Sequence, residues 1–587
     1  MISLILTFFI ISPFIIINDK DVDSQYLTLA SSLSYSYATL GILGLIFVFL
    51  KITFVPLFFI LTIIFLLFLT KKFYRKKLFY LFERFFEKIK FVNNLENYKK
   101  TLKYFYFILF LLLIVSVGPI NHSDTANIYV GYPYKFFINN SHFIDGNLNQ
   151  GLMGIGDFAN IFYFQEKTTW LIRTSQFLPL ILLFFYMLKR KISNIYFFVF
   201  LTSPVFIQWL TIGKNNFLSE SCLALCFLVW EKKKDKAYLP HLFSTIFIAI
   251  SFKISAILIS IPIILYVLFF YINKGFIFNF KNIFRNFSLP LIFSFFILIA
   301  IISYRYFLIN NPFYPLFSTY FNPGDQQLLD WEETLRTWDR AGFFPLWLFI
   351  PKTFGKISFV LGPANLFLII ISAFYFFRKF IPNNAKLNVG LYQLILLLLF
   401  SQGRADYYMA PLILVSLGSP RLFKKDFKFI GQKFNKVLRS FLVLVFFVQF
   451  SMFLISTLYS IALVSYVIFD YEAGMNKTAY NYYNSQKINK SAELPVLSEI
   501  TGMTHLYFDG PFIANQKFDK CFYYDKSIQD NQRYKICMQR EGVKTIIVKK
   551  NKLKNNYSFV CKSENLIRAS RNIFLEEKLE VDFCKLK

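Results

Sequence analysis

Residues 104–129 have the sequence YFYFILFLLLIVSVGPINHSDTANIY and combine two different signals. Residues 104–120 are apolar over a length that can cross a bilayer as a helix. Asp124 then places a carboxylate directly after the end of that helix. A charged side chain near lipid is costly, and it usually faces a cavity in which it acts. The segment therefore predicts a transmembrane helix that carries a functional acid at one membrane face.

The composition of the whole chain extends this prediction. Of 587 residues, 56% are hydrophobic and 21% aromatic, and apolar runs recur from the N-terminus to about residue 469. These values predict an α-helical polytopic membrane protein with about 14 transmembrane helices. The formal net charge is +30, but Lys and Arg cluster in short loops between apolar runs. That distribution is the positive-inside pattern and argues against nucleic acid as a partner.

The basic clusters predict which loops are cytoplasmic. Residues 71–77 (KKFYRKK) and further basic residues up to Lys103 precede the helix at 104–120, so Asp124 is expected on the outer side. Met1–Ile17 is apolar but lacks a basic start and a small-residue cleavage site, and it is interpreted as a retained first helix. The later basic clusters, each at an expected cytoplasmic loop, are 189–191, 232–236, 274–285, 378–386 and 421–439.

The expected organisation has three parts. Residues 1–103 form an N-terminal transmembrane extension with a basic cytoplasmic loop, residues 104–469 a transmembrane core, and residues 470–587 a soluble extracytoplasmic tail. The core has two large outer segments at 121–168 and 309–357. The first 70 residues hold an apolar run at 2–17 and a long one at 33–70 that Lys51 interrupts; three spans with the N-terminus outside would match the charge pattern. The later predicted spans are 104–120, 169–188, 193–211, 217–230, 241–252, 254–272, 288–308, 358–377, 387–400, 407–419 and 440–468.

The tail is predicted to be a small α/β domain. Residues 505–509 and 544–550 resemble short strands, and residues 529–540 resemble a helix. An even number of cysteines in a domain placed outside suggests disulfides, with three possible pairings. We prefer Cys521–Cys537 with Cys561–Cys584. A zinc site is the competing interpretation, but the tail has no CxxC pair and His505 is its only histidine.

Several outer residues are candidates for chemistry. Asp124 is predicted to be a general base, or a ligand for a divalent cation such as Mg²⁺ or Mn²⁺. The alternative is an interfacial loop whose aromatic residues lie at the lipid headgroups. Lys214 and Lys253 fall at outer turns, against the charge bias, and either bind phosphate or extend to the interface. Arg404 lies between two short spans and could hold a phosphate or pyrophosphate.

These motifs together resemble those of the GT-C class of polytopic glycosyltransferases, over residues 104–470. Ser123-Asp124-Thr125-Ala126-x-x-Tyr129 with Pro133-Tyr134-Lys135 resembles the D-x-D-A-x-x-Y-H…P loop of bacterial lipid-linked-sugar transferases related to protein O-mannosyltransferases. Asn311–Pro315 resembles their G-N-P-x-Y-P segment, Arg404–Pro411 their R-Y-x-x-P segment, and Lys214–Asn216 a K-x-D turn. This sequence has no acid at 121–123, has Val130 in place of the usual histidine, and has Asn216 in place of an aspartate.

The resemblance implies transfer of a hexose or pentose from a polyprenyl-phosphate donor to an unknown envelope acceptor, at the outer face of a bacterial inner membrane. Asp124 would be the catalytic base or metal ligand. A transporter or flippase for a lipid-linked saccharide and a non-catalytic envelope assembly protein are the competing functions. The residues expected to bind substrate are Tyr129, Lys214, Lys253, Asn311, Tyr314 and Arg404.

Overall fold

The structure is a computed structural model of the full chain. It describes residues 1–587 except 16–21, 53–55, 94–95, 121, 123, 140–147, 190–193, 274–288, 338–339, 341, 380–383, 420–431, 480, 499–506, 509–511, 515–529, 541, 554–557 and 569–576. The predicted basic loops at 189–191, 274–285, 378–386 and 421–439 fall wholly or partly outside these residues.

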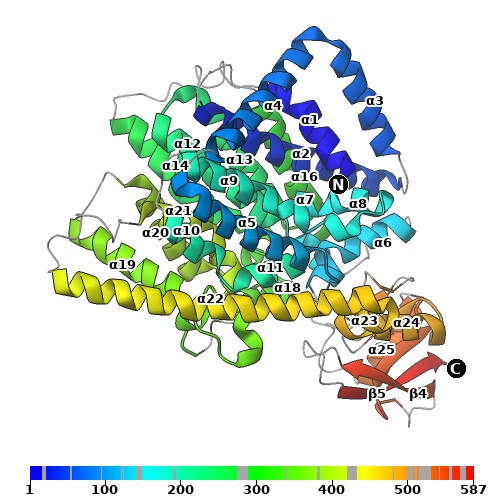
Figure 1. The fold of residues 1–587 in the computed structure, drawn as a ribbon. Coiled ribbons are helices and arrows are strands. Elements are labelled where there is room, and N and C mark those ends of the chain that lie inside the picture. Colours follow the sequence, from blue (N-terminus) through cyan, green and yellow to red (C-terminus); the bar gives the residue numbers. More distant parts are fainter. Residues whose placement is uncertain are drawn as a thin grey trace.

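The first 469 residues form a helical bundle (Figure 1). Apolar segments fold as helices because a lipid environment leaves backbone groups no partners outside their own segment. The helices are α1 (Ile2–Ile15), α2 (Val22–Leu50), α3 (Leu57–Thr70), α4 (Lys72–Asn93), α5 (Glu96–Ser116), α6 (Gly131–Asn139), α7 (Ile155–Phe158), α8 (Asn160–Gln165), α9 (Leu178–Lys189), α10 (Asn194–Leu201), α11 (Val205–Ile212), α12 (Asn216–Lys233), α13 (Leu239–Phe252), α14 (Ala256–Asn273), α16 (Leu289–Ile309), α17 (Ser318–Phe321), α18 (Gln326–Thr337), α19 (Pro363–Lys379), α20 (Ala385–Phe400), α21 (Met409–Gly418) and α22 (Gln432–Phe469).

The chain is a multi-pass membrane protein. Within the described residues, six helical segments are long and apolar enough to cross a membrane, and a seventh is added if α3 and α4, bent by 101°, count as one span. Four more apolar helices are shorter. The predicted number of about 14 transmembrane helices also counted the segments that form α12, α21 and the pair α10–α11. Helices α10, α11 and α21 are each too short to span a bilayer alone.

Most predicted spans coincide with helices, but several regions differ from expectation. The basic loop expected before the span 104–120 forms α4 and the start of α5, and α5 ends at Ser116. The span predicted at 193–211 is two helices, α10 and α11, interrupted before Val205 by Ser203 and Pro204; proline removes a backbone donor and ends a helix. The outer segment 121–168, expected to be a loop, contains short helices that pack into the bundle. Tyr132 and Phe136 are buried there, so these aromatic residues do not lie at the headgroups.

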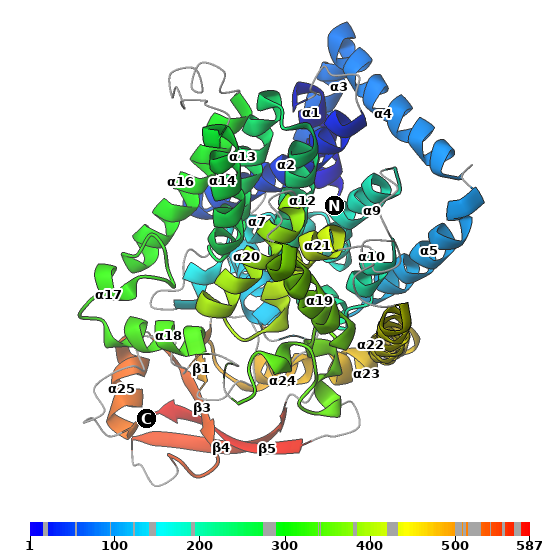
Figure 2. The ribbon, with the colours of Figure 1, turned by 90° about the vertical axis from the view of Figure 1, so that its left-hand side faces the viewer.

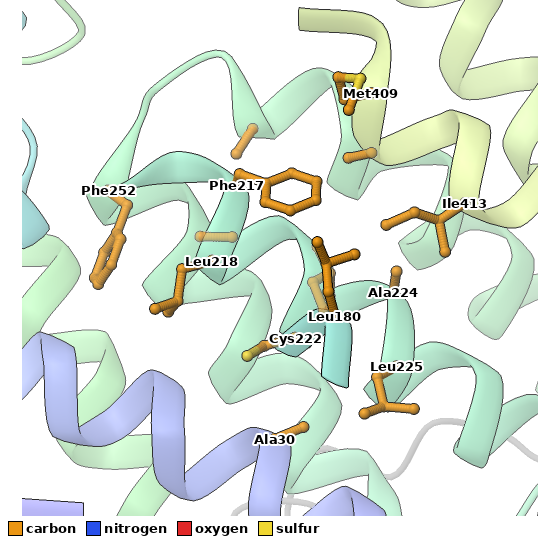
Figure 3. Packing of buried hydrophobic residues seen from close by; sticks show 14 of the residues in the cluster. Ala30, Leu180, Phe217, Leu218, Cys222, Ala224, Leu225, Phe252, Met409 and Ile413 are labelled. Atoms are coloured by element: carbon orange, nitrogen blue, oxygen red, sulfur yellow. The ribbon is translucent and has the colours of Figure 1, made fainter. Parts of the chain in front are cut away.

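The middle of the bundle is formed by helices that are buried on all sides. In α12, Cys222 and Cys226 are fully buried, as expected for packing residues (Figure 3). Ala30 of α2, Leu180 of α9 and Met409 of α21 belong to the same hydrophobic cluster. The peripheral helix α22 is different: only 28% of its most apolar window is buried. Its exposed apolar side chains form a surface suited to lipid.

Residues from 470 form a separate domain at the end of α22, with α23 (Tyr471–Thr478) and α24 (Tyr482–Ser491) at the junction (Figure 1). Its five-stranded sheet has the order β2-β1-β3-β5-β4. The strands are β1 (Val496–Ser498), β2 (Phe512–Ala514), β3 (Thr545–Lys549), β4 (Phe559–Arg568) and β5 (Glu577–Leu586), and the helix is α25 (Asp530–Arg540). The predicted α/β character, the strand at 544–550 and the helix at 529–540 are present.

The cysteines of this domain are partly described. Cys561 of β4 lies directly opposite Cys584 of β5, and the two form a disulfide. Cys521 lies outside the described residues, and the side chain of Cys537 in α25 is not described. In the strand predicted at 505–509, Tyr507 lies in a turn and Phe508 in no regular element; the other three residues are outside the described part.

The two ends of the molecule carry different features. The corner between α3 and α4, where the basic run 71–77 begins, lies at the opposite end of the molecule from the C-terminal domain in both views (Figures 1 and 2). If this basic corner is cytoplasmic, as its charge predicts, the C-terminal domain lies on the outer side.

Candidate active site

Asp124 begins a single turn of π-helix over Thr125–Tyr129. The Val130 amide donates to the carbonyl of Thr125 over 3.0 Å, which is the wide spacing of a π-turn. Such turns are rare and frequent at functional sites. The Asp124 amide donates to Nδ1 of His122 over 3.2 Å. The local backbone therefore fixes the position from which the Asp124 carboxylate points.

Lys214 is delivered by the sharp turn between α11 and α12. Gly213 ends α11 in the left-handed conformation, with φ of 67°. Glycine adopts this conformation without the steric cost that a side chain would add. The turn brings Lys214 into the protein interior, where its side chain is only 3% exposed.

Lys253 follows α13 in an extended conformation. Gly154 packs so closely against the Phe252 carbonyl that a Cβ atom at residue 154 would overlap it. This contact places α7, which begins at residue 155, against the Lys253 turn. Asp157 of α7 therefore enters the same neighbourhood. Its Oδ2 accepts from the Gly154 amide over 2.8 Å.

Arg404 and Asp406 lie between α20 and α21, at a short 3-10 turn over Ala405–Tyr408. Asp406 accepts from two cations, Arg404 and Lys214. Its Oδ1 is 3.2 Å from Nε of Arg404, and its Oδ2 is 3.0 Å from Nζ of Lys214. The Asp406 carboxylate thus lies between the Arg404 guanidinium and the Lys214 ammonium.

Asp124 closes a ring of alternating charge. Its Oδ2 lies 3.1 Å from Nη1 of Arg404 and 3.8 Å from Nζ of Lys214. We call Asp124, Arg404, Asp406 and Lys214 the charge ring. Asp124 is its most accessible member, with 29% of its side chain exposed against 3% for Asp406. Access to the ring is therefore from the Asp124 side.

The ring keeps both carboxylates ionised. Burial alone would raise the pKa of Asp124, but His122, Arg404 and Lys214 outweigh burial and hold that pKa well below its usual range. Burial also opposes ionisation of Asp406, and Arg404 and Lys214 again hold its pKa well below its usual range. Opposite charges at these distances favour the ionised form.

In the described residues Lys253 forms no ion pair with a carboxylate; burial lowers its pKa, and the charges of Asp406 and Glu220 partly oppose this. Within the described residues its Nζ is buried and has no hydrogen-bond partner. It lies 4.2 Å from the ring centroid of Tyr407, and Nζ of Lys214 lies 5.7 Å from the same ring. The Nζ atom does not extend to the surface, which is what the alternative role as an interface anchor requires. It is positioned to receive an anion.

Asp157 is the third acid of the site. Burial raises the pKa of Asp157 to about 7, against the lowering effects of the Gly154 amide, Lys253 and Lys214. Nδ2 of Asn215 lies 3.4 Å from its Oδ1 and donates to the Gly156 carbonyl over 2.7 Å. Asp157 therefore changes its charge near neutral pH, unlike the two carboxylates of the ring.

The donor atoms do not suit a divalent cation. The carboxylate oxygen of Asp124 that could coordinate Mg²⁺ or Mn²⁺ already faces Arg404 and Lys214, whose positive charges oppose a further cation. In the part of the chain that the structure describes, no group of three or more His, Cys, Asp or Glu side chains could hold a metal ion.

The structure brings together most of the residues predicted from sequence. Tyr129 joins the site, with its ring centroid 5.4 Å from Nζ of Lys214. Asn311 and Tyr314 belong to a different cluster. The Asn311 side chain bonds the backbone of its own turn, at Leu316 and Phe313. Tyr314 is fully buried in a hydrophobic cluster with Trp331.

Three residues of the site were not singled out from sequence. Asp406 and Tyr407 are adjacent to the predicted Arg404 motif, and Asp157 is one of several acids in the first outer segment. Their proximity to Arg404 was a usable signal for the first two. No local signal in the sequence marked Asp157 as a site residue, because its position depends on the contact between Gly154 and Phe252.

Comparison with known proteins gives two structural similarities. No family model matches the chain, and no curated protein sequence matches it. The chain is similar to ArnT from Cupriavidus metallidurans bound to undecaprenyl phosphate, with 12% identity and a TM-score of 0.46. It is also similar to the apo state of that ArnT, with 11% identity and a TM-score of 0.44. Each similarity covers 83% of this chain and 98% of that chain.

Proposed function

We propose that this protein transfers a sugar from a polyprenyl-phosphate donor to a hydroxyl group of an envelope acceptor, at the outer face of the membrane. The observation that carries the proposal is the charge ring beside the unpartnered, buried Nζ of Lys253. Lys214, Lys253 and Arg404 place three cations at the site, and Nζ of Lys253 has no hydrogen-bond partner in the described chain. It can therefore bind an oxygen of a singly charged phosphodiester.

The ring also suits the change of charge during transfer. As the acceptor oxygen bonds to the anomeric carbon, the bond from that carbon to the phosphate oxygen breaks. The lipid phosphodiester, with one negative charge, becomes a phosphate monoester with two. Cations placed at the leaving oxygen therefore stabilise the transition state more than the ground state. Arg404, Lys214 and Lys253 would supply this stabilisation.

Asp124 is the proposed proton acceptor. In the free protein His122, Arg404 and Lys214 together lower the pKa of Asp124 and make it a weak base. A bound phosphate would compete for the same two cations and let the pKa of Asp124 rise. The carboxylate would then take the proton of the acceptor hydroxyl, and donor binding would switch on the base.

The C-terminal domain and the basic α3–α4 corner lie at opposite ends of the molecule, which supports an outer position for the site and the tail. The Cys561–Cys584 disulfide fits an oxidising compartment. An outer site matches a donor that arrives through the bilayer and an acceptor in the envelope.

The test uses the purified full-length protein in nanodiscs with polyprenyl-phosphate sugars, and measures sugar transfer and release of polyprenyl phosphate. Asp124→Asn should reduce transfer by roughly 100- to 10,000-fold while still binding polyprenyl monophosphate. The matched control is Asp325→Asn, which alters a carboxylate that bonds the Leu328 amide at the start of α18. Normal turnover by Asp124→Asn would refute the catalytic role. Sugar-lipid translocation without transfer would instead favour a flippase.

A further inference from the structure

The C-terminal domain contacts the outer segment that carries Asp124. Nζ of Lys135, in α6, donates to the backbone carbonyl of Phe508 and lies 5.2 Å from the centroid of its ring. Lys135 is 1% exposed and Phe508 is fully buried. A buried ammonium is costly unless it has partners, so this contact orders both segments.

Tyr507, the residue before Phe508, is anchored within the C-terminal domain. Its carbonyl accepts from Nε2 of Gln486 over 3.4 Å, and its ring centroid lies 5.2 Å from that of Tyr482 in α24. The turn at 507–508 therefore belongs to the folded domain.

Tyr507 also interacts with a second part of the Asp124 segment. Burial raises the pKa of its hydroxyl, while the charge of Arg173 and the Ile120 backbone act in the opposite direction. Nη1 of Arg173 also donates to the Pro119 carbonyl over 3.3 Å. Tyr507 thus meets the chain at the exit of α5, just before Asp124.

The contacts therefore lie on both sides of the catalytic turn. Ile120 precedes Asp124 and the π-turn Thr125–Tyr129, and Lys135 follows them in the next helix. We propose that the turn Tyr507–Phe508 of the C-terminal domain is a positioning element for Asp124, holding both ends of the segment that carries it. The catalytic consequence of this inference rests on the proposed transferase function. The contact between Lys135 and Phe508 is independent of that function.

The physical reason is the sensitivity of transfer to distance. A displacement of about 1 Å of a reacting group can reduce a rate by roughly 100-fold. The phosphate-binding cations lie on other turns, at residues 214, 253 and 404. Loss of the contact should therefore reduce turnover and leave donor binding intact.

The test compares Lys135→Met, Lys135→Arg and Tyr507→Phe in the full-length protein. We expect Lys135→Met to lower kcat by roughly ten- to 100-fold with unchanged affinity for polyprenyl monophosphate, and Lys135→Arg, which keeps a charged donor, to recover most of the rate. Tyr507→Phe removes only a hydroxyl, so it still tests the contact if Lys135→Met fails to fold. The control is Lys487→Met, which breaks an ion pair with Glu564 inside the C-terminal domain.

Hydrogen–deuterium exchange separates this inference from the proposed function. Amides of residues 119–138 should exchange faster in Lys135→Met than in the wild type and the Lys487→Met control. A wild type that transfers no sugar, with this faster exchange in Lys135→Met, would refute the function and keep the docking contact. Unchanged exchange and unchanged kcat in both Lys135→Met and Tyr507→Phe would overturn the positioning role.

Discussion

The two segments of the core predicted to be outer, residues 121–168 and 309–357, both carry carboxylates, but they use their charges differently. In the first, Asp124 reaches residues from distant turns, Arg404 and Lys214. In the second, the Glu332 carboxylate accepts from the backbone amides of Phe317 and Ser318, over 3.1 and 2.6 Å. Its charge serves the local fold of its own segment.

The difference shows how a site can be distinguished from a scaffold. The Glu332 carboxylate is satisfied by nearby backbone, so it has little capacity left for a ligand. The first segment contributes Asp124 to a ring of alternating charge, and the buried Nζ of Lys253 nearby has no hydrogen-bond partner in the described chain. An arrangement that is costly in the free protein and relieved by an anion indicates function.

Removal of the Lys253 charge should have the largest effect on donor binding. Lys253→Met should weaken binding of polyprenyl monophosphate by roughly ten- to 100-fold, because a charge-assisted hydrogen bond to phosphate is lost. Binding is measured by titration in nanodiscs. The control is Lys352→Met, since Lys352 also lies over an aromatic ring, that of Trp347, but is exposed. Equal affinities for both variants would remove Lys253 from the site.

Asp406→Asn should separate turnover from binding. Without this carboxylate, Arg404 and Lys214 would both turn to Asp124 and hold it more tightly. Transfer should fall by roughly tenfold, while affinity for polyprenyl monophosphate should stay the same or increase because the site becomes more positive. Measurements of kcat and affinity on one preparation check this. A variant that loses affinity but keeps kcat would show that Asp406 does not position the ring.

The affinity for a polyprenyl-phosphate sugar, whose phosphodiester keeps one negative charge, should decrease as pH rises through about 7. Asp157 is mostly neutral below its raised pKa of about 7 and negative above it, and the added negative charge repels the phosphate. The expected change is roughly threefold to tenfold between pH 6 and 8. Asp157→Asn should reduce it. Lys253, Lys214 and Arg305 also face Asp157, so an undiminished pH dependence in this variant would assign the titration elsewhere.

The second outer segment should show the smallest effect on activity. Glu332→Gln weakens two bonds to backbone amides, and it should lower stability by about 1 kcal/mol with transfer within roughly twofold of wild type. Thermal unfolding and transfer assays test this. A large loss of transfer at unchanged stability would mean that the second segment also takes part in the reaction, and the contrast between the two segments would fail.

Local sequence was sufficient for the helices and for much of the site. Apolar length marked α14 and α16 with nearly correct ends, because a helix in lipid is specified by its own residues. It also marked the end of α22, but this helix begins at Gln432, within the predicted basic loop 421–439. Lys214 and Lys253 were recognised because cations are uncommon in segments predicted to be outer. Arg404 was recognised because it lies between two predicted spans. The break between α10 and α11 was missed, although Pro204 was visible within the apolar run.

By itself the sequence determined a multi-pass helical membrane protein, an acid at the end of one span, and a cysteine-containing α/β tail. Only the tertiary structure decided that Asp406 joins Arg404 to Lys214, that Asp157 has a pKa of about 7, and that Lys135 meets Phe508. Hydrophobic length and charge are carried by neighbouring residues, so sequence records them. Ion pairs, burial and domain contacts join residues far apart in the chain, and they exist only after the helices have packed.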